Sequence, residues 1–445
     1  MIRRIAVLVS FALIAAACTA SPKPTPSTAP ASPTAPAPST DTASPTPAHV
    51  PSGASAAQAM RALCVQPTYA STEPVAPGET PPDIAEVERQ VEQVRGFEYR
   101  RPVAVQAITD AEMDAKLDAY FEGSYPKAFY DRRTIAWRTI GVIPQDADLR
   151  ESLHAFLTGQ VVGFYDQETG ELVYLGGGDL GLAERFFLSH ELTHAIDDQR
   201  FDLKRLDRIA GRCRDEQVLA ALGAVEGSAQ YFATRVLLEF PTFDLNDILS
   251  LIEQLTSTGG SPPGVPPFVY ALQTWPYEAG LEFVSAEVAS GGMAAVDGAL
   301  RSFPVSTEQI LHPERFPSDV PTPVDVPDLA SGLGPGFTDL DVMQVGEEWL
   351  RAMLRLRLDS GVADAAAAGW DGGVYRAWSD GDRVGGVLRT VWDTPEDARA
   401  FVDALDGWLA AGDTLGAADQ RGSTVYFRFA NDPELVDRLA EATAP

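Results

Sequence analysis

Two histidines one helical turn apart are the first residues in this sequence whose types and spacing could do chemistry. His190 and His194 lie in the segment HELTH, and Glu191 directly follows the first of them. On a helix, side chains four residues apart leave the same face, so both rings could bind one metal ion. Glu191 would lie at the edge of that face, where its carboxylate could take a proton from a water on the metal. Because the chain has only five histidines, the pattern is rare by chance; two core histidines are the structural alternative.

A third ligand decides the kind of zinc site. A metzincin would need a histidine six residues after His194, and that position holds Arg200. Glu226 follows His194 by 32 residues and lies in an apolar stretch, where an unpaired buried carboxylate would be costly. Metal binding would remove that cost, so Glu226 is the predicted third ligand. An exposed carboxylate is the alternative reading of Glu226, and Asp215 and Glu216 are weaker substitutes.

The segments HELTHAIDDQRFDL and ALGAVEGSAQYF together resemble the gluzincins, the thermolysin-like zinc peptidases with an HExxH helix and a glutamate on a later helix. The chain is more closely similar to a group of uncharacterised bacterial lipoproteins identified as metallopeptidases, which carry HELTHAL-x-DQ-x-FDL and an ALVEGDA-like segment. The similarity covers most of 160–316 and the C-terminal pieces GWDGGVYRAW and TVWDTPEDA. It implies that Zn²⁺ is bound by His190, His194 and Glu226. Ser228 is a departure, because the group has Asp at this position.

Such a site would hydrolyse a peptide bond. The zinc would lower the pKa of its water towards about 7, and Glu191 would act as general base and pass the proton to the leaving amine. The developing oxyanion needs a hydrogen-bond donor. His312 and Tyr277 are the candidates, because imidazolium and phenol can both donate. Packing for Tyr277 and capping of a loop for His312 are the structural alternatives.

Two acidic residues follow the second histidine near the expected end of its helix. Asp197 and Asp198 are three and four residues after His194, at a helix end where negative charge is unfavourable. One of them could accept the second ring N–H of His194 and orient the ring. A solvated helix end is the alternative.

The sequence pattern of the elements that must position these residues predicts an α+β fold. Residues 161–175 have the pattern of a β-hairpin whose strands could lie along a peptide substrate. Residues 216–238 and 276–302 have helical patterns, and Gly227 and Ala229 would let the first of these helices approach another backbone closely. We expect a zincin-like catalytic core that is mostly helical around the active site and has a small sheet.

The C-terminal part has a different pattern. A helix is expected over 342–358, followed by paired strands in GGVYRAW and RVGGVLRTVW. Thr394 then begins a helix with Pro at its first position, STVYFRF is a third strand, and DPELVDRLAEA is a final helix. The predicted domains are therefore a catalytic domain over 57–330 and an α+β subdomain over 331–445.

The N-terminal residues predict export. Residues 1–18 combine a basic start with an apolar run too short to span a bilayer, as in a signal peptide. The run ends in LIAAAC, which resembles a bacterial lipobox, so Cys18 would be acylated and would anchor the chain outside the cytoplasmic membrane. Ala15–Ala17 also fits an ordinary signal peptidase site, which would release the protein. Residues 19–56 are rich in Ser, Thr, Pro and Ala and predict a disordered, extended linker.

The three cysteines agree with export. In an oxidising compartment Cys64 and Cys213 could pair, and lipidation would then give a use to the remaining Cys18. Two separate buried thiols are the alternative for Cys64 and Cys213.

The charge of the chain restricts its partners. The 34 basic and 63 acidic residues give a net charge of −29, which repels nucleic acid and anionic lipid head groups. We therefore expect peptide or protein substrates, no nucleic acid, and membrane contact only through the lipid on Cys18. The leading hypothesis is a zinc metallopeptidase at the cell envelope. The alternatives are a non-catalytic envelope lipoprotein that binds a partner or wall component, and a zinc amidase acting on peptidoglycan stem peptides.

Overall fold

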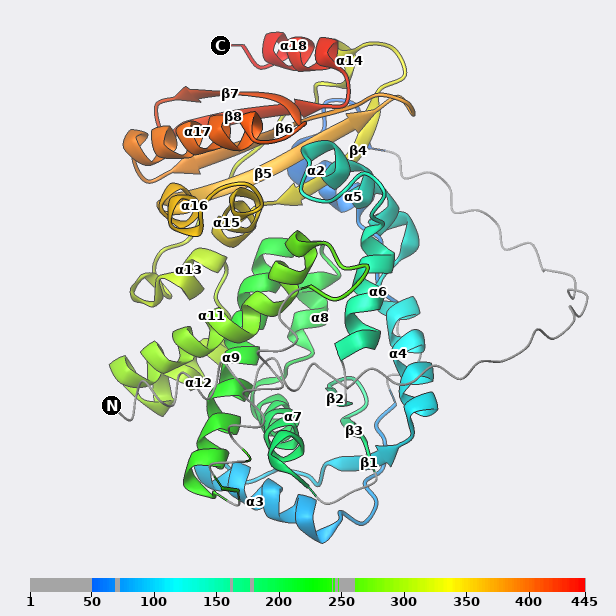
Figure 1. The fold of residues 1–445 in the computed structure, drawn as a ribbon, viewed down its shortest axis with the longest axis vertical. Helices are drawn as coiled ribbons and strands as arrows, with labels where there is room; N and C mark the ends of the chain where they lie inside the picture. The colour runs from blue at the N-terminus through cyan, green and yellow to red at the C-terminus, as the bar shows by residue number, and fades with distance from the viewer. Residues whose placement is uncertain are drawn as a thin grey trace, which may run out of the picture.

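The computed structural model describes residues 50–444 except for 69–72, 161–162, 177–179, 242, 245–246 and 248–260. The predicted signal peptide, Cys18 and most of the linker lie outside these residues. The chain has a mixed α+β fold, as predicted, with a helical part below a larger sheet in Figure 1. The helices of the helical part are α3 (Pro82–Arg95), α4 (Asp110–Ser124), α5 (Lys127–Ile140), α6 (Leu149–Gln160), α7 (Leu182–Phe201), α8 (Arg205–Ala210), α9 (Asp215–Glu239), α11 (Pro267–Gly291), α12 (Met293–Arg301), α13 (Thr307–Leu311) and the short 3₁₀ helix η1 (Pro313–Arg315).

One of the two helices predicted near the site agrees with the structure, and the other does not. The helix expected over 216–238 is α9, with nearly the same ends. The prediction of one helix over 276–302 was wrong. The chain forms two helices there, α11 and α12, which are separated at Gly292, and α11 begins earlier, at Pro267. Gly292 has a φ of 65°, which breaks the helix. Pro276, expected as a helix start, lies inside α11.

A small sheet lies beside α7. It consists of β1 (Ala104–Ile108), β2 (Gly163–Asp166) and β3 (Glu171–Leu175), in the order β1-β3-β2. The antiparallel pair β2 and β3 confirms the predicted hairpin, and Gly170 adopts the positive φ that its turn requires. Because β2 is one of the two outer strands and packs against α7, one edge of the sheet faces the helix that carries HELTH.

The C-terminal sheet has five antiparallel strands in the order β4-β5-β6-β8-β7. The strands are β4 (Thr338–Gln344), β5 (Trp370–Ser379), β6 (Val384–Trp392), β7 (Leu415–Arg421) and β8 (Thr424–Ala430), and the helices are α14 (Ala330–Leu333), α15 (Glu347–Arg355), α16 (Ser360–Ala367), α17 (Pro395–Ala410) and α18 (Pro433–Ala442). The helix expected over 342–358 was wrong in its first turn: the chain is a strand up to Gln344, and α15 begins at Glu347.

Helices cover both faces of this sheet. The side chains of β5 point to both faces of the sheet. Tyr375 and Ala377 belong to one hydrophobic core, with α15, α16 and α17. Val374 and Trp378 belong to a second core, with α14 and α18. The N-terminal helix α2 (Ala56–Leu63) also packs on this second side, against β4. The prediction assigned this segment to the catalytic domain, whereas its contacts are with the C-terminal sheet.

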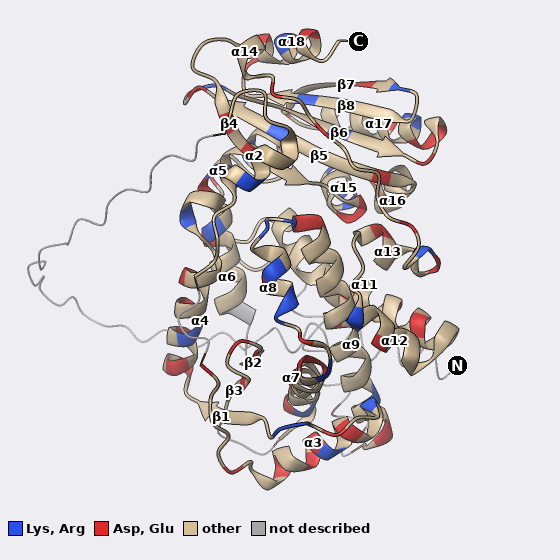
Figure 2. Ribbon diagram, turned by 180° about the vertical axis from the view of Figure 1, so that it is seen from behind, with Lys and Arg blue, Asp and Glu red and all other residues tan. Residues whose placement is uncertain are grey.

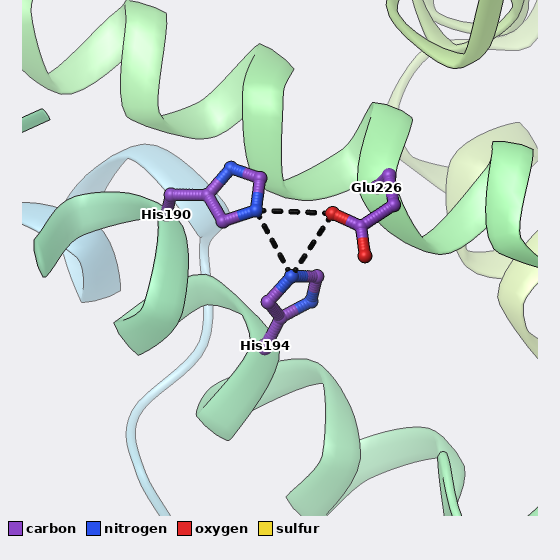
Figure 3. Close-up of side chains that lie close together, drawn as sticks. All are labelled: His190, His194 and Glu226. Carbon is purple, nitrogen blue, oxygen red and sulfur yellow. Dashed lines mark hydrogen bonds and ion pairs between the residues drawn. The ribbon is translucent and has the colours of Figure 1, made fainter. Parts of the chain in front are cut away.

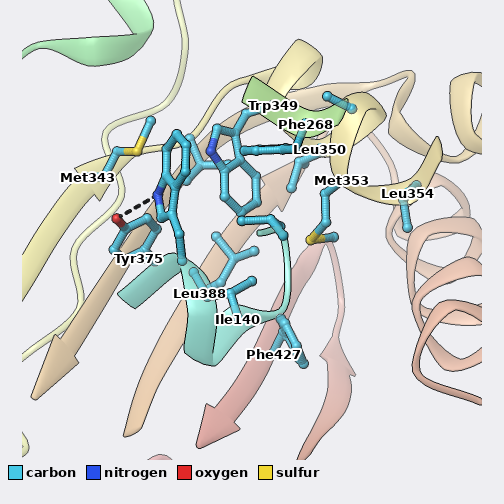
Figure 4. Close-up of a cluster of buried hydrophobic side chains, with 14 of the residues drawn as sticks. Ile140, Phe268, Met343, Trp349, Leu350, Met353, Leu354, Tyr375, Leu388 and Phe427 are labelled. Atoms are coloured by element: carbon cyan, nitrogen blue, oxygen red, sulfur yellow. Dashed lines mark hydrogen bonds between the residues drawn. The ribbon is translucent and has the colours of Figure 1, made fainter. Parts of the chain in front are cut away.

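Helices α5, α6 and α11 of the helical part share a hydrophobic core with one face of the C-terminal sheet. Figure 4 shows Trp349 of α15 beside Phe268 of α11, with their ring centroids 5.3 Å apart. Trp137 of α5 packs edge-on against Phe268 at 5.1 Å and donates a hydrogen bond to the Tyr375 hydroxyl at 3.2 Å. The division of the sequence near residue 330 therefore does not divide the packing.

Charge is distributed without segregation between the two parts. In Figure 2, the Lys and Arg positions of the described residues are scattered among more numerous Asp and Glu positions. Among the described residues, no helix combines the length and the apolar character needed to cross a membrane.

Candidate metal centre

The three predicted ligands meet between α7 and α9. As Figure 3 shows, both imidazole rings and the Glu226 carboxylate point toward one another. Nε2 of His190 is 3.1 Å from Oε2 of Glu226, Nε2 of His194 is 3.3 Å from the same oxygen, and the two nitrogens are 3.0 Å apart. Ligand atoms about 2.1 Å from a tetrahedral zinc are themselves roughly 3.4 Å apart. The triad thus has nearly the spacing that zinc requires, and among the described residues it is the one His/Cys/Asp/Glu group close enough to hold a metal.

The local sequence explains why these side chains converge. One side of α7 is apolar, and Leu188, Leu192 and Ile196 are completely buried in the core, so the opposite side presents both histidines to α9. Glu226 lies in the middle of α9 with a side chain that is 15 % exposed, so the reading of it as an exposed carboxylate does not hold. The two substitute ligands lie elsewhere: Asp215 pairs with Arg133, and Glu216 accepts a hydrogen bond from Thr307.

The electrostatics of the triad favour a bound cation. Burial alone would raise the pKa of Glu226, but the two imidazoles outweigh burial and hold that pKa well below its ordinary value. Burial also disfavours a charged His194 ring, yet Glu226 raises the pKa of His194 to about 9. The three side chains therefore stabilise positive charge between them, which a divalent cation would supply in place of a proton.

Glu191 is held beside the triad by the small sheet. Its Oε2 accepts a hydrogen bond of 2.8 Å from the backbone N–H of Tyr165 in β2. The carboxylate is buried, and burial raises the pKa of Glu191 above its ordinary value. A carboxylate that is close to the ligands and binds a proton more readily than usual has the properties of a general base.

A close crossing of α9 and α11 sets the other side of the site. A Cβ added at Gly227 would overlap the backbone of Gly280, so the two helices touch through their main chains directly beside Glu226. This confirms the close approach predicted from Gly227. Three residues before Gly280, Tyr277 lies with its ring 6.0 Å from the His190 ring at an interplanar angle of 25°. The structure therefore brings Tyr277 to the triad.

His312, the other candidate for the oxyanion, has a different partner. It follows α13, and its Nε2 is 3.1 Å from the Glu347 carboxylate of α15. The hydrogen bond to Glu347 raises the pKa of His312. No contact between His312 and the triad is found among the described residues, so its catalytic role stays a prediction, while its pairing links the helical part to the C-terminal sheet.

Neither role predicted for Asp197 and Asp198 is found among the described residues. Both are buried, so the helix end is not solvated. Asp197 accepts hydrogen bonds from Arg95 at 2.7 Å and from Ser228 at 2.6 Å, while Asp198 accepts one from the Tyr165 hydroxyl at 2.9 Å. Their oxygens are therefore used to fasten α7 to other elements rather than to orient a ring of the triad.

Sequence reasoning missed Arg95 and Tyr165 in this network. Arg95 lies on α3, and its fully buried guanidinium connects Asp197 with Asp297 of α12. The sequence periodicity of one helix does not show that an arginine on it will be buried. Ser228 completes the network by donating a hydrogen bond to Asp197.

Comparisons with known proteins bear on the C-terminal sheet alone. Residues 337–440 match the model of a domain of unknown function (DUF8575). No curated protein and no solved structure matches the chain. The triad lies outside the matched residues, so its interpretation rests on its own geometry.

Proposed function

We propose that this protein is a zinc-dependent peptidase of the gluzincin type. The observation that carries the proposal is the convergence of His190 Nε2, His194 Nε2 and Glu226 Oε2 within 3.3 Å of one another. Two imidazoles and one carboxylate are the ligand set of thermolysin-like catalytic zinc sites, which leave one position open.

The residues around the triad have distinct roles in this proposal. Bound zinc would supply a Lewis acid that polarises the substrate carbonyl and acidifies the attacking water. Glu191 receives the proton of that water and delivers it to the leaving amine. The Tyr165 N–H binds Oε2 of this carboxylate, which leaves Oε1 to carry the proton. Tyr277, beside His190, is the proposed donor to the oxyanion.

The placement of Glu191 favours an enzyme over a binding protein with a structural zinc. A structural zinc is closed by four protein ligands and needs no base beside it, whereas here three ligands are accompanied by the buried Glu191 carboxylate, which the Tyr165 N–H holds in place. Hydrolysis of an amide in a peptidoglycan stem peptide would use the same groups and is the alternative substrate class.

We further propose that the protein works outside the cytoplasmic membrane, anchored through a lipid on Cys18. Support comes from Cys64 and Cys213, which form a disulfide with a Cα–Cα distance of 5.8 Å. A disulfide that joins distant parts of a chain is typical of an oxidising compartment. The end of the predicted linker is folded, with Ala54 and Ala56 buried, and the Pro-rich residues that precede it would hold the folded part away from the membrane.

The proposal is tested by zinc content and peptide hydrolysis of the full chain. Glu226→Ala should lose zinc, and Glu191→Gln should keep about one zinc per chain but lose at least about a hundredfold in turnover. Glu239→Ala is a matched control, because Glu239 lies on the same helix in a surface ion pair with Arg235. Zinc-free wild-type protein after dialysis against zinc, or a fully active Glu191→Gln variant, would refute the proposal. Cleavage of peptidoglycan fragments but of no linear peptide would select the amidase.

A further inference from the structure

We infer that Tyr165 is a positioning residue that fixes the Glu191 carboxylate by clamping β2 onto α7. The inference rests on the proposed function for its catalytic meaning, but the clamp itself is a property of the fold. Tyr165 uses its two ends differently: its backbone N–H binds Glu191, and its side-chain hydroxyl binds Asp198.

The spacing of the contacts on α7 makes β2 and the helix a single unit. Phe187, Glu191 and Asp198 are separated by four and seven residues, so they lie along one face of the helix over about three turns. Gly163 lies so close to Phe187 that a Cβ at residue 163 would overlap the Phe187 ring. Tyr165 then contacts the next two positions of the same face, with hydrogen bonds of 2.8 Å and 2.9 Å.

The hydroxyl end of Tyr165 is the anchor. It is buried, and burial together with the neighbouring Asp198 raises the pKa of Tyr165 well above its ordinary value, so the phenol stays protonated and donates. Asp198 is itself fixed by the backbone N–H of Leu203 at 3.0 Å and lies 3.6 Å from the Arg101 guanidinium. A charge-assisted hydrogen bond to a buried carboxylate holds a side chain more firmly than a neutral one does.

The backbone end of Tyr165 determines where the proton acceptor lies. Because β2 is an outer strand of the small sheet, alternate N–H groups point away from β3 and can bind other groups. The Tyr165 N–H meets Oε2 of Glu191, so a shift of β2 along α7 would move the general base itself. Displacements of about 1 Å in a catalytic group can reduce turnover by roughly a hundredfold.

The test compares Tyr165→Phe with Tyr99→Phe. Tyr99 is half-buried, and its hydroxyl also binds α7, but through the Leu192 carbonyl at 2.8 Å rather than through Glu191. In the zinc-loaded full chain, Tyr165→Phe should lower kcat about tenfold with KM and zinc content unchanged, and Tyr99→Phe should leave kcat within about twofold. Equal kcat losses in the two variants, or none in Tyr165→Phe, would overturn the positioning role.

A second readout does not need activity. In the zinc-free protein, amide hydrogen exchange at residue 165 should be at least about tenfold faster in Tyr165→Phe than in wild type, because the strand loses its anchor. Tyr99→Phe should leave this exchange rate unchanged. If Tyr165→Phe does not fold, Asp198→Ala provides the same test by removing the acceptor of the hydroxyl bond. Unchanged exchange in the folded variants would refute the clamp, whereas a zinc-loaded wild type that cleaves no peptide would refute the proposed function alone.

Discussion

Replacing Gly280 by alanine would place a methyl group inside the backbone of α9. The new Cβ would be 2.9 Å from the Gly227 nitrogen and still closer to the Gly223 carbonyl oxygen. Real Cβ atoms essentially never lie within 3.0 Å of such atoms, and neither neighbour is a flexible side chain that could turn aside. The two helices would have to separate by on the order of 1 Å at their crossing.

The expected cost of Gly280→Ala follows from this overlap. Overpacking of a rigid contact costs about 1–3 kcal/mol, while the better helix propensity of alanine returns about 1 kcal/mol. Because Gly227 is bonded to Glu226, the same separation would pull the carboxylate away from the histidines. We expect zinc affinity to fall about 10- to 100-fold, as it does when the support of a ligand is lost.

The assay is urea unfolding followed by circular dichroism, together with a zinc titration against a chromophoric chelator. Gly298→Ala is the control, because Gly298 lies within α12 and an added Cβ there meets no atom within 4 Å. That variant should be as stable as wild type or more stable by up to about 1 kcal/mol. If Gly280→Ala unfolds at the wild-type urea concentration and binds zinc equally well, the helix crossing does not position Glu226.

Three further changes test other contacts. Replacing Cys64 and Cys213 together by alanine should lower the free energy of unfolding by about 2–5 kcal/mol, measured in urea against the oxidised wild type. Burial raises the pKa of Glu348 to about 8, so this carboxyl keeps a proton in the folded chain that the unfolded chain releases near pH 4. The unfolding free energy should therefore fall as the pH rises from about 5 to 8, and Glu348→Gln should make that fall smaller; an unchanged pH profile would contradict the assignment. Ser228→Ala should cost about 1–3 kcal/mol by removing the bond to Asp197, and a neutral result in thermal unfolding would show that this bond contributes nothing.

The sequence predicts the part of the site that depends on helical periodicity. His190 and His194 are four residues apart, and a helix is enough to place both rings on one face. Glu226 could be predicted because a carboxylate in an apolar stretch of helix must have a partner. Gly227 could be predicted because a residue without a side chain permits backbone contact. Each of these arguments uses one element at a time.

The residues that sequence reasoning missed act between elements. Tyr165 contacts Glu191 through its backbone N–H. Almost every residue has such a group, so the residue type does not indicate this contact. Arg95 reaches Asp197 across 102 residues, and that pairing depends on how α3 packs on α7. The failure at 342–344 has a related cause: the apolar residues of β4 run directly into the apolar face of α15, so periodicity alone did not separate strand from helix.

The dependence of the candidate metal centre on distant segments also bears on the role of the C-terminal sheet. Two residues before α9 begins, Cys213 is bonded to Cys64 at the end of α2, which packs on β4. In the first turn of α9, Glu216 accepts a hydrogen bond from the Thr307 hydroxyl, which in turn accepts one from the Glu348 N–H of α15. The start of the helix that carries Glu226 is therefore tied to the C-terminal sheet in two independent ways. A sheet that shares a core with the helical part and fixes a ligand helix has a structural reason to be present, whether or not it also touches substrate.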